Sequence, residues 1–207
     1  MLRIMTKTQK AIRIAFLALS GIIAGALCCL ARLDPPKDVV TGVNYPAEFF
    51  CESGENPMAL QTDGNCASYA AAYVLRNLGE QADGEEIAAE MQRLFGFVPA
   101  KSIVRVLESH GFSAEACRGD VDSLKQRLAS GVPIIVFVSI PKDTHYAVVV
   151  GYDRQNFYLV DSLAENQNAD GDGYNRKLTA AEFERIWRTH TMLSDNIYIV
   201  AGSNVNR

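Results

Sequence analysis

Three short runs of β-branched and aromatic residues follow one another late in the chain and constrain its fold most strongly. They cover residues 133–140, 145–152 and 157–161, and turn residues separate them. Runs of this length and composition are typical of strands, and short connections favour antiparallel pairing between neighbours. We therefore expect an antiparallel sheet, in which a turn over residues 153–156 joins the last two of these strands.

The half of the chain before these strands has a helical pattern instead. Residues 66–78 are rich in Ala and Leu and stop at Gly79, while Ile87 and Met91 recur at helical spacing within residues 84–95. Further helices are expected over residues 100–109, 121–128 and 180–188, followed by a last strand over residues 196–201. Helices that precede strands in this way indicate an α+β fold, in which a helical layer packs on a mostly antiparallel sheet.

The first 32 residues differ from the rest of the chain. Basic residues, among them Arg3 and Arg13, precede an uncharged apolar run over residues 14–31. This layout predicts either a cleaved signal peptide or a single-span membrane anchor over residues 1–32. Lipidation at Cys28 or Cys29 is disfavoured, because no small residue precedes the cysteine that would be modified. Both remaining interpretations place the following domain outside the cytoplasm, either secreted or attached to the membrane.

Composition and patterning set the domain boundaries and exclude one class of function. Residues 33–59 are rich in Pro, Asp, Gly and Asn without sustained periodicity, so we expect a tether that packs loosely onto a domain over residues 60–203. The 207 residues carry a formal net charge of -4 and no basic stripe. A nucleic-acid partner is therefore not expected, since such proteins cluster cations to meet the phosphates.

Cys66 begins the first of the expected helices, where unpaired backbone N–H groups favour thiolate over thiol. His145 opens one strand and Asp161 closes the next, so antiparallel pairing would bring the carboxylate beside the imidazole. Gln61, five positions before Cys66, has a side-chain amide that could stabilise an oxyanion. Together these residues supply the nucleophile, base, orienting group and donor of a cysteine hydrolase. Taken singly, each one also fits ordinary packing or turn chemistry.

The cysteines outside the apolar segment leave two arrangements open. In an oxidising compartment Cys51, Cys66 and Cys117 include one odd thiol. A bridge between Cys51 and Cys117 would leave Cys66 free for catalysis. The alternative is that all three thiols are unpaired.

A polar loop after Asp161 imitates the first half of a calcium-binding loop. Asn168, Asp170 and Asp172 place oxygens at alternating positions before a glycine. Thr179 stands at the twelfth position, where a bidentate Glu is expected. The loop is therefore a weak calcium candidate or simply a flexible polar loop, and no other metal or cofactor is indicated.

The segment from Gln61 to Cys66 and the runs VPIIVFVSI, HYAVVVGYD and FYLVDS resemble the cysteine peptidases that process bacteriocin and peptide-pheromone leaders, within the papain-like superfamily. The resemblance covers residues 60–162, about half of the chain. It implies a papain-like fold with Cys66 as nucleophile and His145 as base. It also implies that Asp161 orients His145 and that Gln61 is the oxyanion-hole glutamine.

Three positions depart from that family's usual pattern. Ala67 follows the cysteine where the family has Gly, and Gln61 stands one residue closer to Cys66 than is common in the family. Ser162 follows Asp161 where the family has Pro. None of these differences removes a catalytic group.

The resemblance implies a peptidase that hydrolyses a peptide or protein substrate through a thioester acyl-enzyme, without a cofactor. Family members fused to ABC transporters cut after double-glycine leaders on the cytoplasmic side. The N-terminal segment of this chain indicates the opposite side, so double-glycine specificity is not carried over. A cell-wall amidase, an acyl or amine transferase and a catalytically silent binding module remain alternatives on the same fold.

Overall fold

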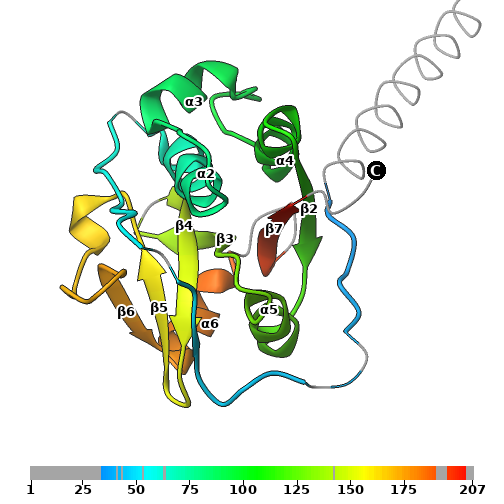
Figure 1. Ribbon diagram of the computed structural model, residues 1–207, viewed down its shortest axis with the longest axis vertical. Helices are drawn as coiled ribbons and strands as arrows, with labels where there is room; N and C mark the ends of the chain where they lie inside the picture. Colours follow the sequence, from blue (N-terminus) through cyan, green and yellow to red (C-terminus); the bar gives the residue numbers. More distant parts are fainter. Residues whose placement is uncertain are drawn as a thin grey trace, which may run out of the picture. The chain divides into compact units, whose positions relative to one another are not determined.

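The computed structural model describes residues 34–40, 42, 44–52, 54–62, 64–141, 143–189 and 195–203. The described residues from Pro35 onward form one compact unit, coloured from blue to red in Figure 1. The expected signal peptide or anchor over residues 1–32 lies outside the described residues. Within the described ones, no helix is both long enough and apolar enough to cross a bilayer.

A seven-stranded sheet forms the centre of this unit, and six of its strands follow the order β2-β7-β3-β4-β5-β6 (Figure 1). The seventh, the short strand β1, pairs with β4. All of these strand pairs are antiparallel. The strands are β1 (Phe49–Phe50), β2 (Phe112–Arg118), β3 (Ile134–Ile140), β4 (Asp143–Tyr152), β5 (Asn156–Val160), β6 (Arg176–Thr179) and β7 (Ile197–Ser203). The antiparallel sheet expected from the three apolar runs is confirmed.

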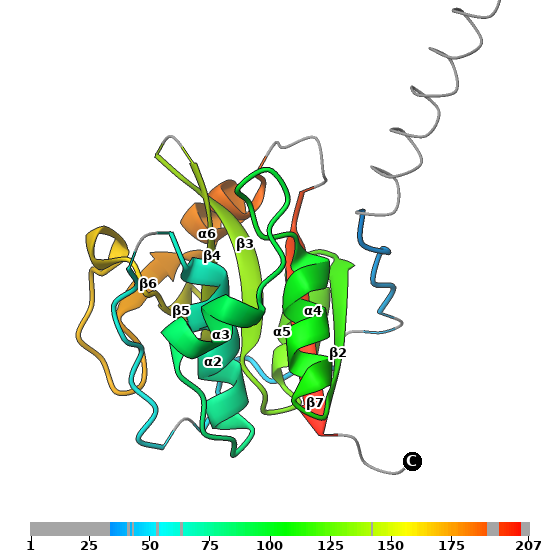
Figure 2. The same ribbon diagram turned by 90° about the horizontal axis from the view of Figure 1, so that it is seen from above.

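Helices cover both faces of the sheet (Figure 2). One face carries α2 (Cys66–Asn77), α3 (Gly84–Glu90) and α4 (Ala100–Ser109), and the other carries α5 (Val121–Leu128) and α6 (Ala180–Trp187). The expected α+β fold with a helical layer on an antiparallel sheet is therefore confirmed, and α5 and α6 add a layer on the opposite face.

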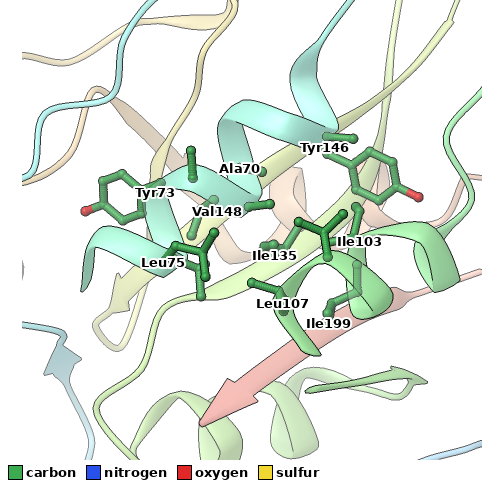
Figure 3. Packing of buried hydrophobic residues seen from close by; sticks show 14 of the residues in the cluster. Ala70, Tyr73, Leu75, Ile103, Leu107, Ile135, Tyr146, Val148 and Ile199 are labelled. Atoms are coloured by element: carbon green, nitrogen blue, oxygen red, sulfur yellow. The ribbon is translucent and has the colours of Figure 1, made fainter. Parts of the chain in front are cut away.

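Strand β3 shows why the central strands are apolar along their whole length. Successive side chains of a strand point to opposite faces. Ile135 accordingly packs in the core beneath α2 and α4, shown in Figure 3, while Ile134 and Val136 pack in the core beneath α5 and α6. With both faces buried, no polar alternation is left in the sequence of this strand.

Helix α3 is shorter than the 84–95 helix expected from the sequence, because it ends at Glu90. Met91 already has an extended backbone, with φ -73° and ψ 122°. The N–H of Gln92 then donates to the Ser102 hydroxyl at 2.7 Å instead of to a helical carbonyl. Phe95 lies in a turn with φ 51° and is fully exposed. Its apolar spacing in the sequence therefore does not reflect a buried helical face.

Three strands, β1, β2 and β6, are missing from the sequence-based expectation, and β1 has only two residues. The β2 segment FSAEACR contains Ala, Ser and Glu, which are weak strand formers. It nevertheless pairs with β7 along its whole length, including Ala114 opposite Ala201. Strand β6 has only four residues, RKLT. In β2 and β6, pairing with a neighbour outweighs a weak local preference.

The described part of residues 33–59 is attached more firmly than the loose tether expected there. Phe49 pairs with Tyr152 of β4. The Asp38 carboxylate accepts hydrogen bonds from Nε and Nη2 of Arg127 at 2.9 and 3.0 Å. Strand pairing and a bidentate ion pair thus join this segment to the sheet and to α5.

Cys51 and Cys117 are free and buried, so the bridge considered between them is not formed. Cys117 lies on β2, whereas Cys51 follows β1 and donates its N–H to Val150 of β4. Strands β7 and β3 stand between β2 and β4. Because neighbouring strands are about 4.8 Å apart, the two residues exceed the Cα separation of about 7 Å that a disulfide can span.

Candidate active site

Cys66 is the first residue of α2, as expected. The helix begins there because the carbonyl of Asn65 accepts hydrogen bonds from the N–H groups of Ser68 and Tyr69 at 3.0 and 3.2 Å. The first N–H groups of a helix have no partner inside it, and they form its positive end. The Cys66 sulfur therefore lies where negative charge is stabilised, and its own N–H is placed to serve an oxyanion.

The loop before Cys66 is held by one carboxylate. Glu85, at the start of α3, accepts hydrogen bonds from Thr62, from Asn65 Nδ2 at 3.2 Å and from the Tyr69 hydroxyl at 2.7 Å. Arg93 in turn donates to Asn65 Oδ1 at 2.5 Å. The side chain of Asn65 therefore fixes the loop instead of capping the helix.

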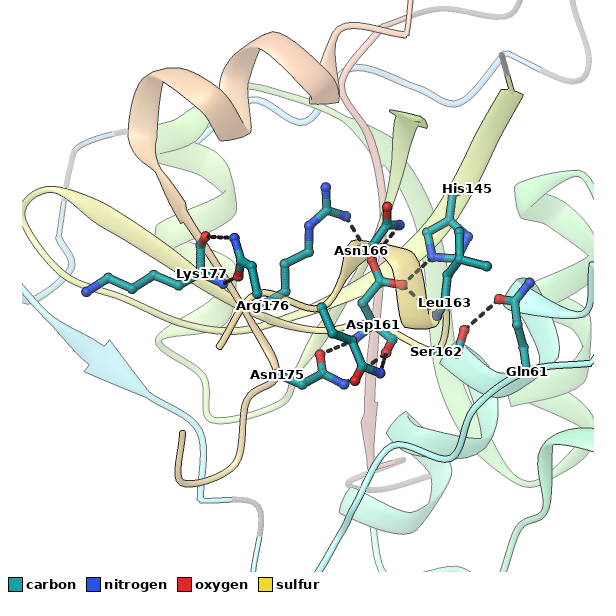
Figure 4. Close-up of polar contacts among 11 residues, drawn as sticks. Gln61, His145, Asp161, Ser162, Leu163, Asn166, Asn175, Arg176 and Lys177 are labelled. Carbon is teal, nitrogen blue, oxygen red and sulfur yellow. Dashed lines mark hydrogen bonds and ion pairs between the residues drawn. The ribbon is translucent and has the colours of Figure 1, made fainter. Parts of the chain in front are cut away.

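His145 is the third residue of β4, and Asp161 directly follows β5. The Nε2 atom of His145 lies 2.7 Å from Oδ1 of Asp161, and the side chains are 2% and 0% exposed (Figure 4). Because the imidazole uses Nε2 for Asp161, Nδ1 is the nitrogen left to serve Cys66. The structure thus brings together the two strand residues that the sequence analysis paired.

Asp161 is the most heavily supported group of the site. Besides His145, its carboxylate accepts hydrogen bonds from Leu163 N–H at 2.9 Å, Asn166 Nδ2 at 3.0 Å and Arg176 Nη1 at 2.8 Å. The Asn175 side chain pairs with the backbone N–H and C=O of Asp161 at 2.7 and 2.9 Å. These contacts hold the carboxylate in one position and also stabilise its negative charge.

The two buried groups stabilise each other's charged forms. Burial lowers the pKa of His145, but the hydrogen bonds to Asp161 and to Cys66 outweigh it and raise that pKa to about 9. Burial raises the pKa of Asp161, while its bond to His145 and the nearby Arg176 more than offset this and hold that pKa below its ordinary value. The imidazole therefore has a hydrogen-bond partner on each side, the carboxylate of Asp161 and the sulfur of Cys66.

Gln61 and Cys66 line one cleft of about 400 Å³ together with His145. Its walls also include apolar side chains, among them Phe97 and Phe137. Gln61 is tied to the residue after Asp161, since its backbone N–H donates to the Ser162 carbonyl at 2.9 Å and its Oε1 accepts from the Ser162 hydroxyl at 2.7 Å. All four residues proposed from the sequence therefore meet at one place. A larger cleft, of about 680 Å³, lies beside α5 and β2 and contains none of them.

The sequence pattern did not identify the residues that support this group. Arg176 and Asn175 stand on or beside a strand it did not predict, and Ser162 was noted only as a departure from the family pattern. No local spacing marks them, because they act through contacts between distant parts of the chain. A buried arginine within a short strand is the one signal available, and burial is known only after folding.

In the loop considered for calcium, the first candidate ligand is bonded to the protein's own backbone. The Asn168 side chain pairs with the backbone of Lys177, accepting from its N–H at 2.8 Å and donating to its C=O at 2.9 Å. Its carbonyl oxygen is thus already engaged. In the part of the chain that the structure describes, no group of three or more His, Cys, Asp or Glu side chains is placed to hold a metal ion. Calcium binding by Asp170 and Asp172 stays a prediction.

An antiparallel sheet with helices on both faces, a Cys and a His that line one cleft, and an Asp bonded to that His are typical of the papain-like class of cysteine peptidase folds. Within that class, residues 55–194 match the model of the Peptidase_C39 like family. The chain therefore belongs to the Peptidase_C39 like family, as the resemblance read from the sequence implied. Among curated proteins the comparison finds no match.

Solved structures agree with this placement. The peptidase domain of Streptococcus ComA, a bifunctional ABC transporter, superposes with a TM-score of 0.57 at 17% identity, over 72% of this chain and 100% of that domain. A C39-like peptidase from Bacillus anthracis gives 0.55 at 18% identity, over 75% and 98%. A double-glycine-motif protease from an AMS/PCAT transporter, solved with a leader peptide, gives 0.54 at 17% identity, over 70% and 89%. At these identities the likeness establishes the fold.

Proposed function

We propose that this protein is a cysteine peptidase in which Cys66 is the nucleophile, His145 the acid and base, and Asp161 the group that orients His145. The observation that carries the proposal is the buried 2.7 Å contact between His145 and Asp161 at the cleft that also contains Cys66. Membership of the Peptidase_C39 like family supports the same chemistry.

The proposed reaction has two steps. The Cys66 thiolate forms a bond to the peptide carbonyl carbon, and the electron pair of the C=O bond moves to the oxygen. When that pair returns, the C–N bond breaks and the leaving amine takes a proton from His145, which leaves a thioester. His145 then removes one proton from water, whose oxygen attacks the thioester to release a carboxylic acid and regenerate the Cys66 thiolate; the acid loses its proton to solvent.

A peptide is the proposed substrate. One protein of the same fold was solved in complex with a leader peptide. The cleft of this chain is lined by apolar groups as well as by Arg93 and Asp143, which suits an extended peptide with mixed side chains. Digestion of a peptide library in parallel with peptidoglycan fragments would separate a peptidase from a wall amidase on the same fold.

Selective alkylation tests the nucleophile. Burial raises the pKa of Cys51 to about 12 and that of Cys117 to about 11, so both thiols should react slowly with iodoacetamide at pH 7. We expect Cys66 to react first, as measured by mass spectrometry of its peptide. His145→Ala should slow that reaction at least tenfold, because the thiolate loses its imidazolium partner.

His110→Ala is the matched control for this experiment. The ring nitrogens of His110 form hydrogen bonds with the carboxylates of Glu80 and Glu90, and His110 does not line the cleft that contains Cys66. Its loss should leave the Cys66 rate unchanged. Equal and slow alkylation of Cys66 in the unaltered protein and in His145→Ala would refute the proposed mechanism.

We propose further that the domain acts outside the cytoplasm, directed there by residues 1–32. This proposal rests on the basic and apolar pattern of that segment alone. Cell fractionation of the full chain, with N-terminal sequencing of the mature protein, would test it. Recovery of uncleaved protein in the soluble cytoplasmic fraction would contradict it.

A further inference from the structure

We propose that Ser162 is a positioning residue for the oxyanion donor, holding the Gln61 side chain with its N–H groups toward the cleft. This inference rests on the proposed peptidase function. Ser162 is 2% exposed and donates its hydroxyl hydrogen to Gln61 Oε1 at 2.7 Å. The backbone N–H of Gln61 donates to the Ser162 carbonyl at 2.9 Å, so two hydrogen bonds join these residues (Figure 4).

The hydroxyl selects one of two orientations of the amide. A glutamine amide accepts at its oxygen and donates at its nitrogen, so the two ends are opposite in character. With Oε1 bonded to Ser162, Nε2 is the end left to face the cleft that Gln61 shares with Cys66. The reversed amide would present oxygen lone pairs to the negative charge of a tetrahedral intermediate. A fixed donor is useful because an oxyanion is best stabilised by groups that need no rearrangement.

The same short segment also supports the base. Asp161 holds His145, and the next residue holds Gln61. Asn175 pairs with both backbone groups of Asp161, which fixes the segment itself. One anchored dipeptide therefore sets both the base and the oxyanion donor.

Two probes of Cys66 separate an oxyanion effect from a general loss of structure. A peptidyl aldehyde adds reversibly: the thiolate bonds the carbonyl carbon, and the electron pair of the C=O bond moves to the oxygen, which then needs donors. Iodoacetamide is attacked at its CH₂ carbon, which expels iodide and forms no oxyanion. On the full chain we would measure the rate at which iodoacetamide alkylates Cys66 and the affinity of Cys66 for the aldehyde acetyl-Leu-Leu-norleucinal. The affinity is read from the aldehyde concentration that protects Cys66 from iodoacetamide.

Ser162→Ala should weaken aldehyde binding about tenfold relative to any change in the iodoacetamide rate, the size expected for one neutral hydrogen bond. Ser162→Thr, which keeps the hydroxyl, should restore most of the loss. Ser109→Ala is the control for removing a hydroxyl elsewhere, since Ser109 donates to the Val106 carbonyl within α4. Its aldehyde binding should match that of the unaltered protein.

A double-mutant cycle with Gln61→Ala shows whether Ser162 acts through Gln61. If it does, Gln61→Ala combined with Ser162→Ala binds the aldehyde no more weakly than Gln61→Ala alone. Additive losses overturn the inference, and so does unchanged aldehyde binding in Ser162→Ala. A Cys66 that iodoacetamide labels but the aldehyde never protects also overturns it, because no working oxyanion donor would be present. A Cys66 that does not react selectively refutes the proposed function itself.

Discussion

The two halves of the candidate site are held in different ways. On the sheet side, His145 and Asp161 are almost completely buried, and four donors converge on the carboxylate of Asp161. On the loop side, the segment before Cys66 is held by Glu85, which is exposed, and by the buried Ser162. Removing one partner from a buried charged group is costly, whereas exposed ionic contacts contribute little.

Because of this difference, we expect the sheet side to determine folding stability and the loop side to determine the reactivity of the Cys66 thiol. The sheet side joins β4, β5 and β6 through groups that lose their partners if any one of them is removed. The loop side instead positions Cys66 mainly through the contacts of the exposed Glu85, which water can replace in part. Substitutions on the sheet side should therefore reduce folding stability strongly, and substitutions on the loop side should mainly change the behaviour of the thiol.

Asp161→Asn should have the largest effect. The neutral amide leaves Arg176 buried without its counter-ion, and breaking one partner of a buried ion pair costs about 3–5 kcal/mol. Urea unfolding of the full chain measures this loss. Asp172→Asn, in an exposed part of the following loop, is the control and should leave the midpoint nearly unchanged. A midpoint for Asp161→Asn equal to that of the control would contradict the strong coupling of the sheet side.

The pH dependence of stability should show the contribution of His145. Its pKa is about 9 in the folded protein, against an ordinary value of 6.5, so the protonated ring stabilises the folded state. This contribution is complete below about pH 6.5 and is lost as the pH rises through about 9. His145→Gln cannot take up the proton, so its deficit should shrink between pH 6 and pH 9.5 by an amount on the order of 3 kcal/mol. Parallel unfolding curves against pH for both proteins would rule this out.

The contrast also explains what the sequence could and could not predict. Strand β3 and helix α2 follow from local composition, because apolar β-branched runs and Ala-rich runs specify their own secondary structure. Cys66, His145 and Asp161 stand at the ends of such elements, where the turn-linked antiparallel pairing fixes which residues can meet.

The supporting residues depend on contacts that no local pattern encodes. Arg176 reaches Asp161 across the β5–β6 pair, and β6 is too short to be recognised from its composition. Glu85 lies at the start of α3 and resembles any acidic residue near a helix N-terminus. The helix predicted over residues 84–95 was too long for a related reason. Met91 and Phe95 have the same helical spacing in the sequence, but only Met91 is buried in the folded protein.

Phe95 marks a strained position in the turn between Leu94 and Phe97, outside both halves of the site. Its φ of 51° is unfavourable for a side chain with a Cβ atom, and its ring is fully exposed, so no burial offsets this cost. Phe95→Gly should therefore raise stability by about 1 kcal/mol. Leu94→Gly, at the neighbouring position, is the control and should not stabilise. A loss of stability in Phe95→Gly would mean that the exposed ring has a structural role.

Glu85→Gln should have the smallest effect on stability, although it alters three contacts to the Cys66 loop. The amide keeps one acceptor for Thr62, Asn65 and Tyr69 but presents a donor where the carboxylate had a second oxygen. We expect the urea midpoint to change little and alkylation of Cys66 by iodoacetamide to slow by about twofold, as for a weakened exposed hydrogen bond. Glu86→Gln, one position along the same helix, should change neither. If Glu85→Gln instead destabilised the protein as much as Asp161→Asn, the loop would be as essential to folding as the sheet, and the separation of stability from reactivity would fail.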